Sequence, residues 1–202
     1  MLDFREIVED ARREHHRLVD AFLDLHAEDL ARLAEWCADA LLHGGKVLFF
    51  GNGGSAADAQ HLAAEFVNRF DRERPGLAAI ALATDGSVLT SIANDAEFSQ
   101  VFSRQVQALG RPGDVAVGIT TSGGSPNVLA ALRAARGGGL RTAALLGREG
   151  GPARAEAELA LVVPGRETAR IQEVHILAGH LLCRRVEDLI ERSAESRLTS
   201  SS

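Results

Sequence analysis

Five short, continuously apolar segments constrain the fold of this 202-residue chain more than any other feature. Continuous rather than alternating hydrophobicity predicts strands covered on both faces, which is typical of parallel sheets. Helical patterns separate most of the segments, so the sequence predicts an α/β fold: a three-layer, doubly wound domain with a five-stranded parallel sheet flanked by helices. The strand segments are 46–50, 77–83, 114–120, 141–146 and 159–163, and the clearest helical patterns between them are 56–70, 98–109 and 127–135.

Helical sequence flanks these segments on both sides. Two helices are expected first, one at about Phe4–His26 and one from about Glu28 to the pair Gly44-Gly45, which suits a helix C-terminus. A last helix at about Glu167–Arg192 is apolar around most of its circumference. That breadth predicts packing against another subunit, with a single amphipathic surface helix as the alternative. The expected organisation is an N-terminal helical arm used in oligomer packing (1–45), the α/β domain (46–195) and a flexible tail (196–202).

Composition excludes several classes of protein. A formal net charge of −6 argues against a general nucleic-acid binder, which would carry a basic surface. The longest apolar run, 77–83, is far below the ~20 residues of a membrane span, and the charged N-terminus lacks a signal-peptide pattern. Cys37 and Cys183 form no disulfide framework. We therefore expect a cytoplasmic protein without membrane or nucleic-acid partners.

The first strand runs directly into a glycine-rich turn, Gly51 to Ser55, and then into a helix. Small residues let a ligand approach the backbone, and the helix N-terminus offers free N–H groups to an anion. The turn loosely matches a dinucleotide-binding fingerprint, but no acidic residue follows at the usual distance of ~20 residues. A tight structural turn is the alternative interpretation.

A second loop of this kind, Thr120-Thr121-Ser122-Gly123-Gly124-Ser125, follows the third apolar segment. Its hydroxyls and backbone N–H groups suit phosphate oxygens, and Ser125 also suits a helix N-cap. Ligands of doubly wound sheets bind beyond the carboxyl ends of the strands, where both loops are expected. Together the loops predict a small phosphorylated ligand such as a sugar phosphate.

Candidate catalytic and metal-binding residues lie on two of the predicted helices. His61 and Glu65 are spaced to share one helix face, where they could serve as metal ligand and carboxylate base; a solvated surface contact is the alternative. In the last helix, Gln172 and His180 are about 12 Å apart along the axis. If both are functional, they are expected to meet in one site from two different subunits. His175 is expected to be structural.

Taken together, these segments resemble the phosphoheptose isomerases, a family with the sugar isomerase (SIS) fold. The resemblance spans nearly the whole chain and makes 46–195 a SIS domain. It implies a homotetramer with active sites at subunit interfaces, one Zn²⁺ per subunit, and conversion of D-sedoheptulose 7-phosphate to D-glycero-D-manno-heptose 7-phosphate for surface-glycan synthesis. The motifs that carry it are GNGGSAADAQHLAAEF, RPGLAAIAL, SIANDAEF, GITTSGGSPNV and ARIQEVHILAGH.

The resemblance also implies roles for individual residues. Glu65 and His180 would be the acid–base pair. Ala169 stands where some members carry aspartate, which leaves assistance with ring opening unassigned. The implied metal ligands are His61, Glu65, Gln172 and His180. The implied substrate contacts are Asn52, Gly53, Gly54, Ser55, Glu65, Asn94, Asp95, Thr120, Thr121, Ser122, Ser125 and Gln172.

Two other functions stay open. A related SIS protein is a non-catalytic tetramer that binds the bacterial replication initiator, and parts of this chain are similar to it. That relative lacks the carboxylate and histidine that correspond to Glu65 and His180, which favours the enzyme interpretation here. The other alternative is an isomerase or a sensor for a different sugar phosphate.

Overall fold

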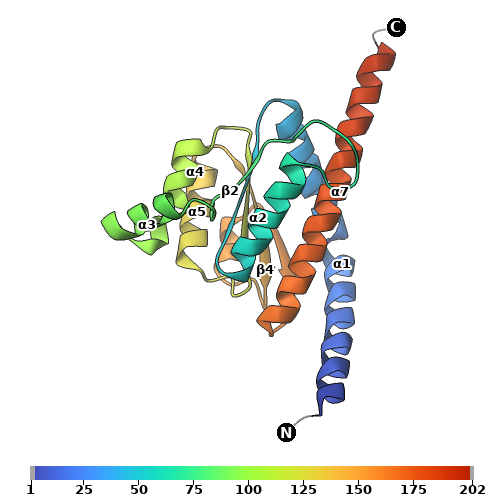
Figure 1. The fold of residues 1–202 in the computed structure, drawn as a ribbon, viewed down its shortest axis with the longest axis vertical. Helices are drawn as coiled ribbons and strands as arrows, with labels where there is room; N and C mark the ends of the chain where they lie inside the picture. Colours follow the sequence, from blue (N-terminus) through green and yellow to red (C-terminus); the bar gives the residue numbers. More distant parts are fainter. Residues whose placement is uncertain (1–2, 201–202) are drawn as a thin grey trace.

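The predicted three-layer α/β architecture is confirmed by the structure, a computed structural model that describes residues 3–200 (Figure 1). All paired strands are parallel, and their order in the sheet is β2-β1-β3-β4-β5. The second strand is much shorter than its apolar segment. The strands are β1 (Val47–Gly51), β2 (Ala79–Ala81), β3 (Val115–Thr120), β4 (Arg141–Gly147) and β5 (Leu159–Val163).

The continuous hydrophobicity of the strands arises because both faces of the sheet are buried. Alternate residues of β1 belong to different core clusters: Val47 and Phe49 to one, Leu48 and Phe50 to the other. The first cluster lies beneath α1 (Phe4–Leu42), α2 (Gly54–Val67) and α7 (Thr168–Ser200). The second lies beneath α4 (Ser103–Leu109), α5 (Pro126–Gly137) and α6 (Ala153–Glu156).

The expectation of two separate N-terminal helices is wrong, because α1 is one continuous helix of 39 residues. Its sequence contains neither glycine nor proline, so nothing local breaks it. His26, where the break was expected, instead accepts a hydrogen bond through Nε2 from the backbone N–H of Val162 in the edge strand β5, at 3.1 Å. Burial begins at Leu18, and the first turns of α1 project beyond the sheet (Figure 1).

Helix α7 is covered mainly by its own chain. Val174, Ala178, Leu182 and Val186 are buried in the cluster shared with α1 and α2. Its broad apolar surface therefore does not by itself require another subunit. The helix ends at Ser200, so residues 196–200 of the expected flexible tail are helical, and 201–202 lie outside the described residues.

A polar contact joins α1 and α7 away from the sheet: His15 Nδ1 lies 2.9 Å from Glu173 Oε2. Within α7, Arg170 forms an ion pair with the same carboxylate at 2.7 Å. The start of α7, which carries Gln172, is thus tied to the projecting half of α1.

Cys37 in α1 and Cys183 in α7 are both buried and are not joined by a disulfide.

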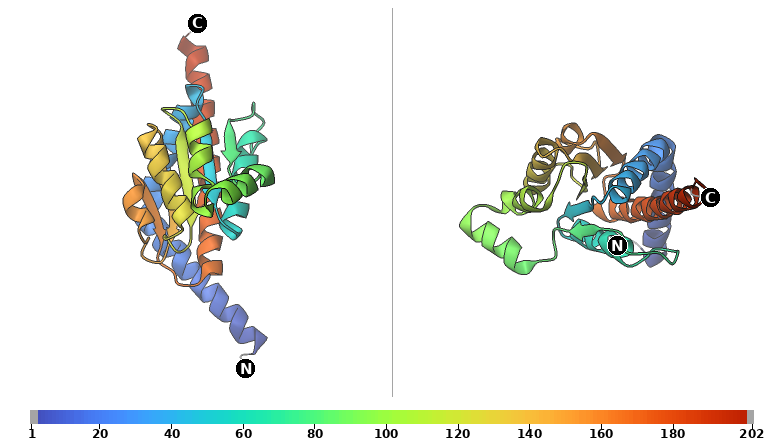
Figure 2. Two further views of the ribbon diagram at one scale, coloured as in Figure 1. Left: turned by 90° about the vertical axis from the view of Figure 1, so that its left-hand side faces the viewer. Right: turned by 90° about the horizontal axis from the view of Figure 1, so that it is seen from above.

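The region after β2 differs from its expected structure. Helix α3 (Gly86–Asp95), which the apolar pattern did not reveal, contains no buried residue and projects from the sheet (Figure 2). The single helix expected at 98–109 is a 3₁₀ turn, η1 (Phe98–Gln100), followed by α4. Within the part of the chain that the structure describes, no helix has the length and apolar character of a membrane span.

Candidate active site

The turn after β1 brings the start of α2 against α7. Gly53 has φ +57°, in the left-handed region that favours glycine, and α2 begins at the next residue. A Cβ at Gly54 would lie 2.1 Å from Gln172 Nε2, so the amide of Gln172 packs directly on the helix start. Two expected substrate contacts, one from each helix, therefore lie side by side within a single chain.

The loop after β3 gathers hydroxyl groups. Thr120 Oγ1 lies 3.0 Å from Ser125 Oγ and 3.4 Å from Ser122 Oγ, and Ser122 Oγ accepts a hydrogen bond from the Gly124 N–H at 3.2 Å. Thr121 belongs to the same loop. Because β1 and β3 are neighbours, their two carboxyl-end loops are adjacent, as the sequence predicts. Clustered hydroxyls beside two helix N-termini suit a phosphate group.

The two loops are joined by a pair of amides. Asn52 Nδ2 donates to Asn127 Oδ1 at 2.9 Å, and Asn127 Nδ2 donates to Asn52 Oδ1 at 2.7 Å. Asn127, at the start of α5, is 2% exposed. Asn127 was not predicted from the sequence, because the pattern around it is that of an ordinary helix start. Its burial and its partner become visible only when the two loops are placed together.

Further along α2, three side chains of the expected set meet. His61 Nε2 lies 2.9 Å from His180 Nε2 and 3.4 Å from Glu65 Oε1. The Phe70 ring packs against His180, with ring centroids 5.5 Å apart. His61 is well exposed and Glu65 is partly buried. We call His61, Glu65 and His180 the His–Glu cluster; it combines two imidazoles and a carboxylate at an accessible position.

Gln172 and His180 stay apart, as their helical spacing predicts, but each finds a partner in the same chain. Gln172 contacts Gly54 at the start of α2, and His180 contacts His61 about two turns later. The two helices thus run alongside each other in the same direction. One chain brings His61, Glu65 and His180 together and places Gln172 beside the loops.

The side chains of the His–Glu cluster are of the types that bind zinc, but their spacing is not that of a formed zinc site. Two imidazoles and a carboxylate are a common zinc donor set, with an open position for substrate. At Zn–N distances of ~2.0–2.1 Å, two nitrogens on one tetrahedral ion lie roughly 3.3 Å apart, which is wider than the 2.9 Å between His61 and His180. Among the described residues, no group of three or more His, Cys, Asp or Glu side chains is arranged to hold a metal ion. The residue types of the cluster therefore suit zinc, while the spacing of the two imidazole nitrogens is closer than on a tetrahedral zinc ion.

Comparisons with known proteins agree with this architecture. The SIS domain family model matches residues 12–147. A phosphoheptose isomerase from Paramagnetospirillum magneticum is 61% identical over 160 residues, which covers 79% of this chain and 83% of the relative. The solved phosphoheptose isomerase of Neisseria gonorrhoeae is 44% identical with a TM-score of 0.87, covering 92% of this chain and 100% of that one. The chain belongs to the phosphoheptose isomerase family. The solved family member from Francisella tularensis, with 34% identity and a TM-score of 0.89, covers 93% of this chain and 100% of its own.

In this phosphoheptose isomerase family member, Asn94 and Asp95 lie apart from the two loops. They sit at the C-terminus of the projecting helix α3, where Asn94 Nδ2 donates to Asp95 Oδ1 at 2.9 Å. Asp95 borders a hollow that is also lined by Gln100 and Arg104. The single chain therefore does not bring these two expected substrate contacts to the His–Glu cluster.

Two titratable residues near the site, the buried His175 and the partly buried Asp58, have shifted pKa values. His175, expected to be structural, is fully buried and its Nε2 lies 3.0 Å from the Leu146 carbonyl oxygen. Burial lowers the pKa of His175 to about 4, against a smaller opposing effect of that hydrogen bond. Burial raises the pKa of Asp58 to about 6, opposed by nearby His61, and Asp58 Oδ2 has no hydrogen-bond partner among the described residues. His175 is thus a neutral core residue.

Proposed function

We propose that this chain is an aldose–ketose isomerase that converts D-sedoheptulose 7-phosphate to D-glycero-D-manno-heptose 7-phosphate, in the synthesis of heptose precursors for surface glycans. The observation that carries the proposal is that Glu65 and His180 both lie beside His61. His61 and Glu65 belong to α2, whose N-terminus adjoins the hydroxyl loop, and His180 belongs to α7. The high identity to proteins named phosphoheptose isomerase supports it.

The phosphate end of the substrate binds at the loops. The hydroxyls of Thr120, Ser122 and Ser125 and the N-terminus of α2 supply hydrogen bonds and a favourable dipole. Residues 54 and 65 are separated by about 16 Å along the helix axis, which favours a long sugar phosphate over a three-carbon one. Phosphate binding at one end then orients the reacting carbons at the other.

The His–Glu cluster performs the proton transfers. Glu65 takes the proton from the carbon next to the carbonyl, and the electron pair of that C–H bond forms the enediol. His180 gives a proton to the carbonyl oxygen and later removes one from the neighbouring hydroxyl, after which Glu65 returns its proton to the other carbon. A positioned acid or base contributes roughly 10²–10⁴-fold to the rate.

We further propose one Zn²⁺ per subunit. His61, Glu65 and His180 would hold it, with one carboxylate oxygen of Glu65 and one ring nitrogen of His180 left for the proton transfers. The family resemblance adds Gln172, which in this chain lies beside Gly54. When bound, the ion would polarise the carbonyl and stabilise negative charge on the enediol oxygens. The test is turnover and Zn²⁺ content before chelation, after chelation, and after Zn²⁺ is restored.

A homotetramer with interfacial active sites is also part of the proposal, as is a cytoplasmic location. The support for assembly is an uncovered apolar face on the projecting part of α1. Phe4, Ile7 and Val8 are 74%, 48% and 45% exposed, and their spacing places them on one side of the helix. Light scattering of the full chain measures the assembly directly.

The deciding experiment compares isomerisation of sedoheptulose 7-phosphate by wild type, Glu65→Gln and His180→Gln. We expect wild-type turnover and a loss of at least ~100-fold in each variant, with fold and assembly unchanged. Absence of turnover in well-folded, Zn²⁺-loaded wild type would contradict the proposal. Binding to the replication initiator would then support the adaptor alternative, and turnover of another sugar phosphate would support a different isomerase.

A further inference from the structure

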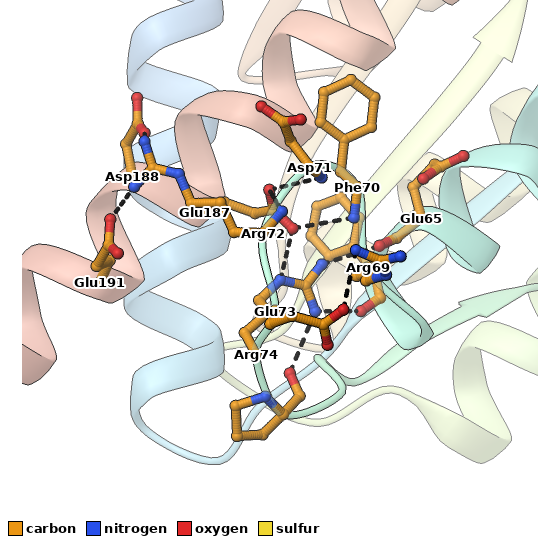
Figure 3. A network of polar contacts seen from close by, with 12 residues as sticks. Glu65, Arg69, Phe70, Asp71, Arg72, Glu73, Arg74, Glu187, Asp188 and Glu191 are labelled. Carbon is orange, nitrogen blue, oxygen red and sulfur yellow. Dashed lines mark hydrogen bonds and ion pairs between the residues drawn. The ribbon is translucent and has the colours of Figure 1, made fainter.

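A buried carboxylate organises the loop that follows α2 (Figure 3). Glu187 of α7 has a side chain only 2% exposed. Its oxygens accept hydrogen bonds from the backbone N–H groups of Phe70, Asp71 and Arg72 at 3.0, 3.0 and 3.3 Å. Burial acts to raise the pKa of Glu187, but these bonds and Arg74 outweigh it, so the pKa lies below its ordinary value. The carboxylate is therefore charged and fully engaged.

Arg74 completes this network and reaches α2. Its Nε donates to Glu187 Oε1 at 2.8 Å, its Nη2 to the Glu65 carbonyl oxygen at 2.9 Å, and its Nη1 to the Phe66 carbonyl oxygen at 2.9 Å. The last carbonyls of a helix lack partners within the helix, and a cation there also complements the helix dipole. Arg74 thus caps the turn of α2 that carries Glu65.

The same network reaches the second catalytic group. Glu187 holds the backbone N–H of Phe70, and the Phe70 ring packs against His180. One buried ion pair therefore touches the backbone of Glu65 on one side and, through Phe70, the imidazole of His180 on the other.

We infer that Arg74 and Glu187 are positioning residues for the isomerase reaction, which hold Glu65 and His180 in their mutual orientation. The inference rests on the proposed function. The competing interpretation is an ion pair that stabilises the fold and has no influence on the reaction. The two interpretations differ in what happens to kcat when the charges are removed together from a folded protein.

The test is the double variant Arg74→Met/Glu187→Gln, which leaves no unpaired buried charge and keeps an acceptor for the loop N–H groups. The matched control is Arg133→Met/Glu156→Gln, which removes an ion pair of 2.7 Å between α5 and α6. We expect kcat of the Arg74/Glu187 variant to fall by at least ~10-fold, with KM within about twofold because the phosphate loops are intact. The control keeps both parameters. If the double variant does not fold, Arg74→Lys is measured in the same way, because it keeps the charge opposite Glu187 and removes the guanidinium donors to the Glu65 and Phe66 carbonyl oxygens.

A second readout does not depend on turnover. In protein with ¹³C-labelled histidine, the nearby Phe70 ring shifts the NMR signal of His180, so release of the loop moves that signal in the Arg74/Glu187 variant and not in the control. Unchanged kcat and an unchanged His180 signal in a folded variant would overturn the inference and leave the proposed function intact. An inactive wild type would overturn the proposed function, and the inference would then be decided by the His180 signal.

Discussion

The amide of Gln172 fills the space that a side chain at Gly54 would need: a Cβ there would lie 2.1 Å from Gln172 Nε2. The start of α2 is thus matched to one particular neighbour on α7. Gly54 is required for this contact rather than for backbone conformation, because the positive φ lies at Gly53 instead.

Gly54→Ala tests that match. The Gln172 side chain can swing aside, so we expect the free energy of unfolding to change by less than about 1 kcal/mol, while KM for the sugar phosphate rises several-fold. Steady-state kinetics and urea unfolding measure the two effects. Gly86→Ala, at a position with no atom within 4 Å of the added Cβ, is the control. Unchanged KM in Gly54→Ala would show that the position of Gln172 is unimportant for binding.

Thr120→Val tests the hydroxyl loop. The substitution keeps the shape of this buried side chain and removes the Oγ1 that contacts Ser122 and Ser125. Loss of one hydrogen bond to a charged phosphate, worth about 1.5–3 kcal/mol, predicts a KM increase of roughly 10–100-fold with little change in kcat. A kcat decrease at constant KM would place Thr120 in the reaction rather than in phosphate binding.

Asn127→Ala removes one half of the amide pair that joins the two loops. Asn52 then loses both of its hydrogen bonds to a buried partner. We expect the free energy of unfolding to fall by about 1–3 kcal/mol and KM to rise, because the glycine-rich turn is no longer held against the hydroxyl loop. Urea unfolding and kinetics give both quantities. A loss of stability with normal KM would limit Asn127 to a structural role.

His175 predicts a pH dependence of stability. Its pKa is lowered from 6.5 to about 4 in the folded protein, so between these values the unfolded chain binds one more proton. The free energy of unfolding therefore falls as the pH is lowered through this window, by up to roughly 3 kcal/mol from this residue. His175→Gln is expected to flatten the dependence measured by urea unfolding from pH 7 to pH 4. The exposed His43→Gln is the control, and an equally steep curve in both variants would contradict the assignment.

The sequence predicted the sheet well because burial on both faces leaves a strong local signal, as in β1 and β3. It failed where the signal is weak. Helix α3 buries no residue completely, and its apolar stripe of Leu89, Ile92 and Ala93 is short, so it was not recognised in the sequence. In α1, a boundary was expected near His26 although no residue there breaks a helix. The local sequence pattern thus indicates which segments are buried and where a helix is broken, but it does not indicate exposed elements such as α3.

The same division holds for the site. The glycine-rich turn, the hydroxyl loop and the pair His61 and Glu65 are short motifs, and they were visible in the sequence. The partners Asn127, Arg74 and Glu187 were not, because Glu187 meets Arg74 only after α7 packs beside α2. The spacing of Gln172 and His180 correctly predicted their separation, but it carried no information on which residues of α2 would face them.

The unbroken course of α1 has a mechanical consequence. At 1.5 Å per residue its 39 residues form a rod of about 58 Å, without a glycine or proline that could act as a hinge. The uncovered start of the rod and the part packed on the sheet must therefore tilt together. His15 joins this rod to Glu173, the immediate neighbour of Gln172. A tilt of the projecting end of α1 therefore also displaces Glu173 and its neighbour Gln172, which lies against the glycine-rich turn.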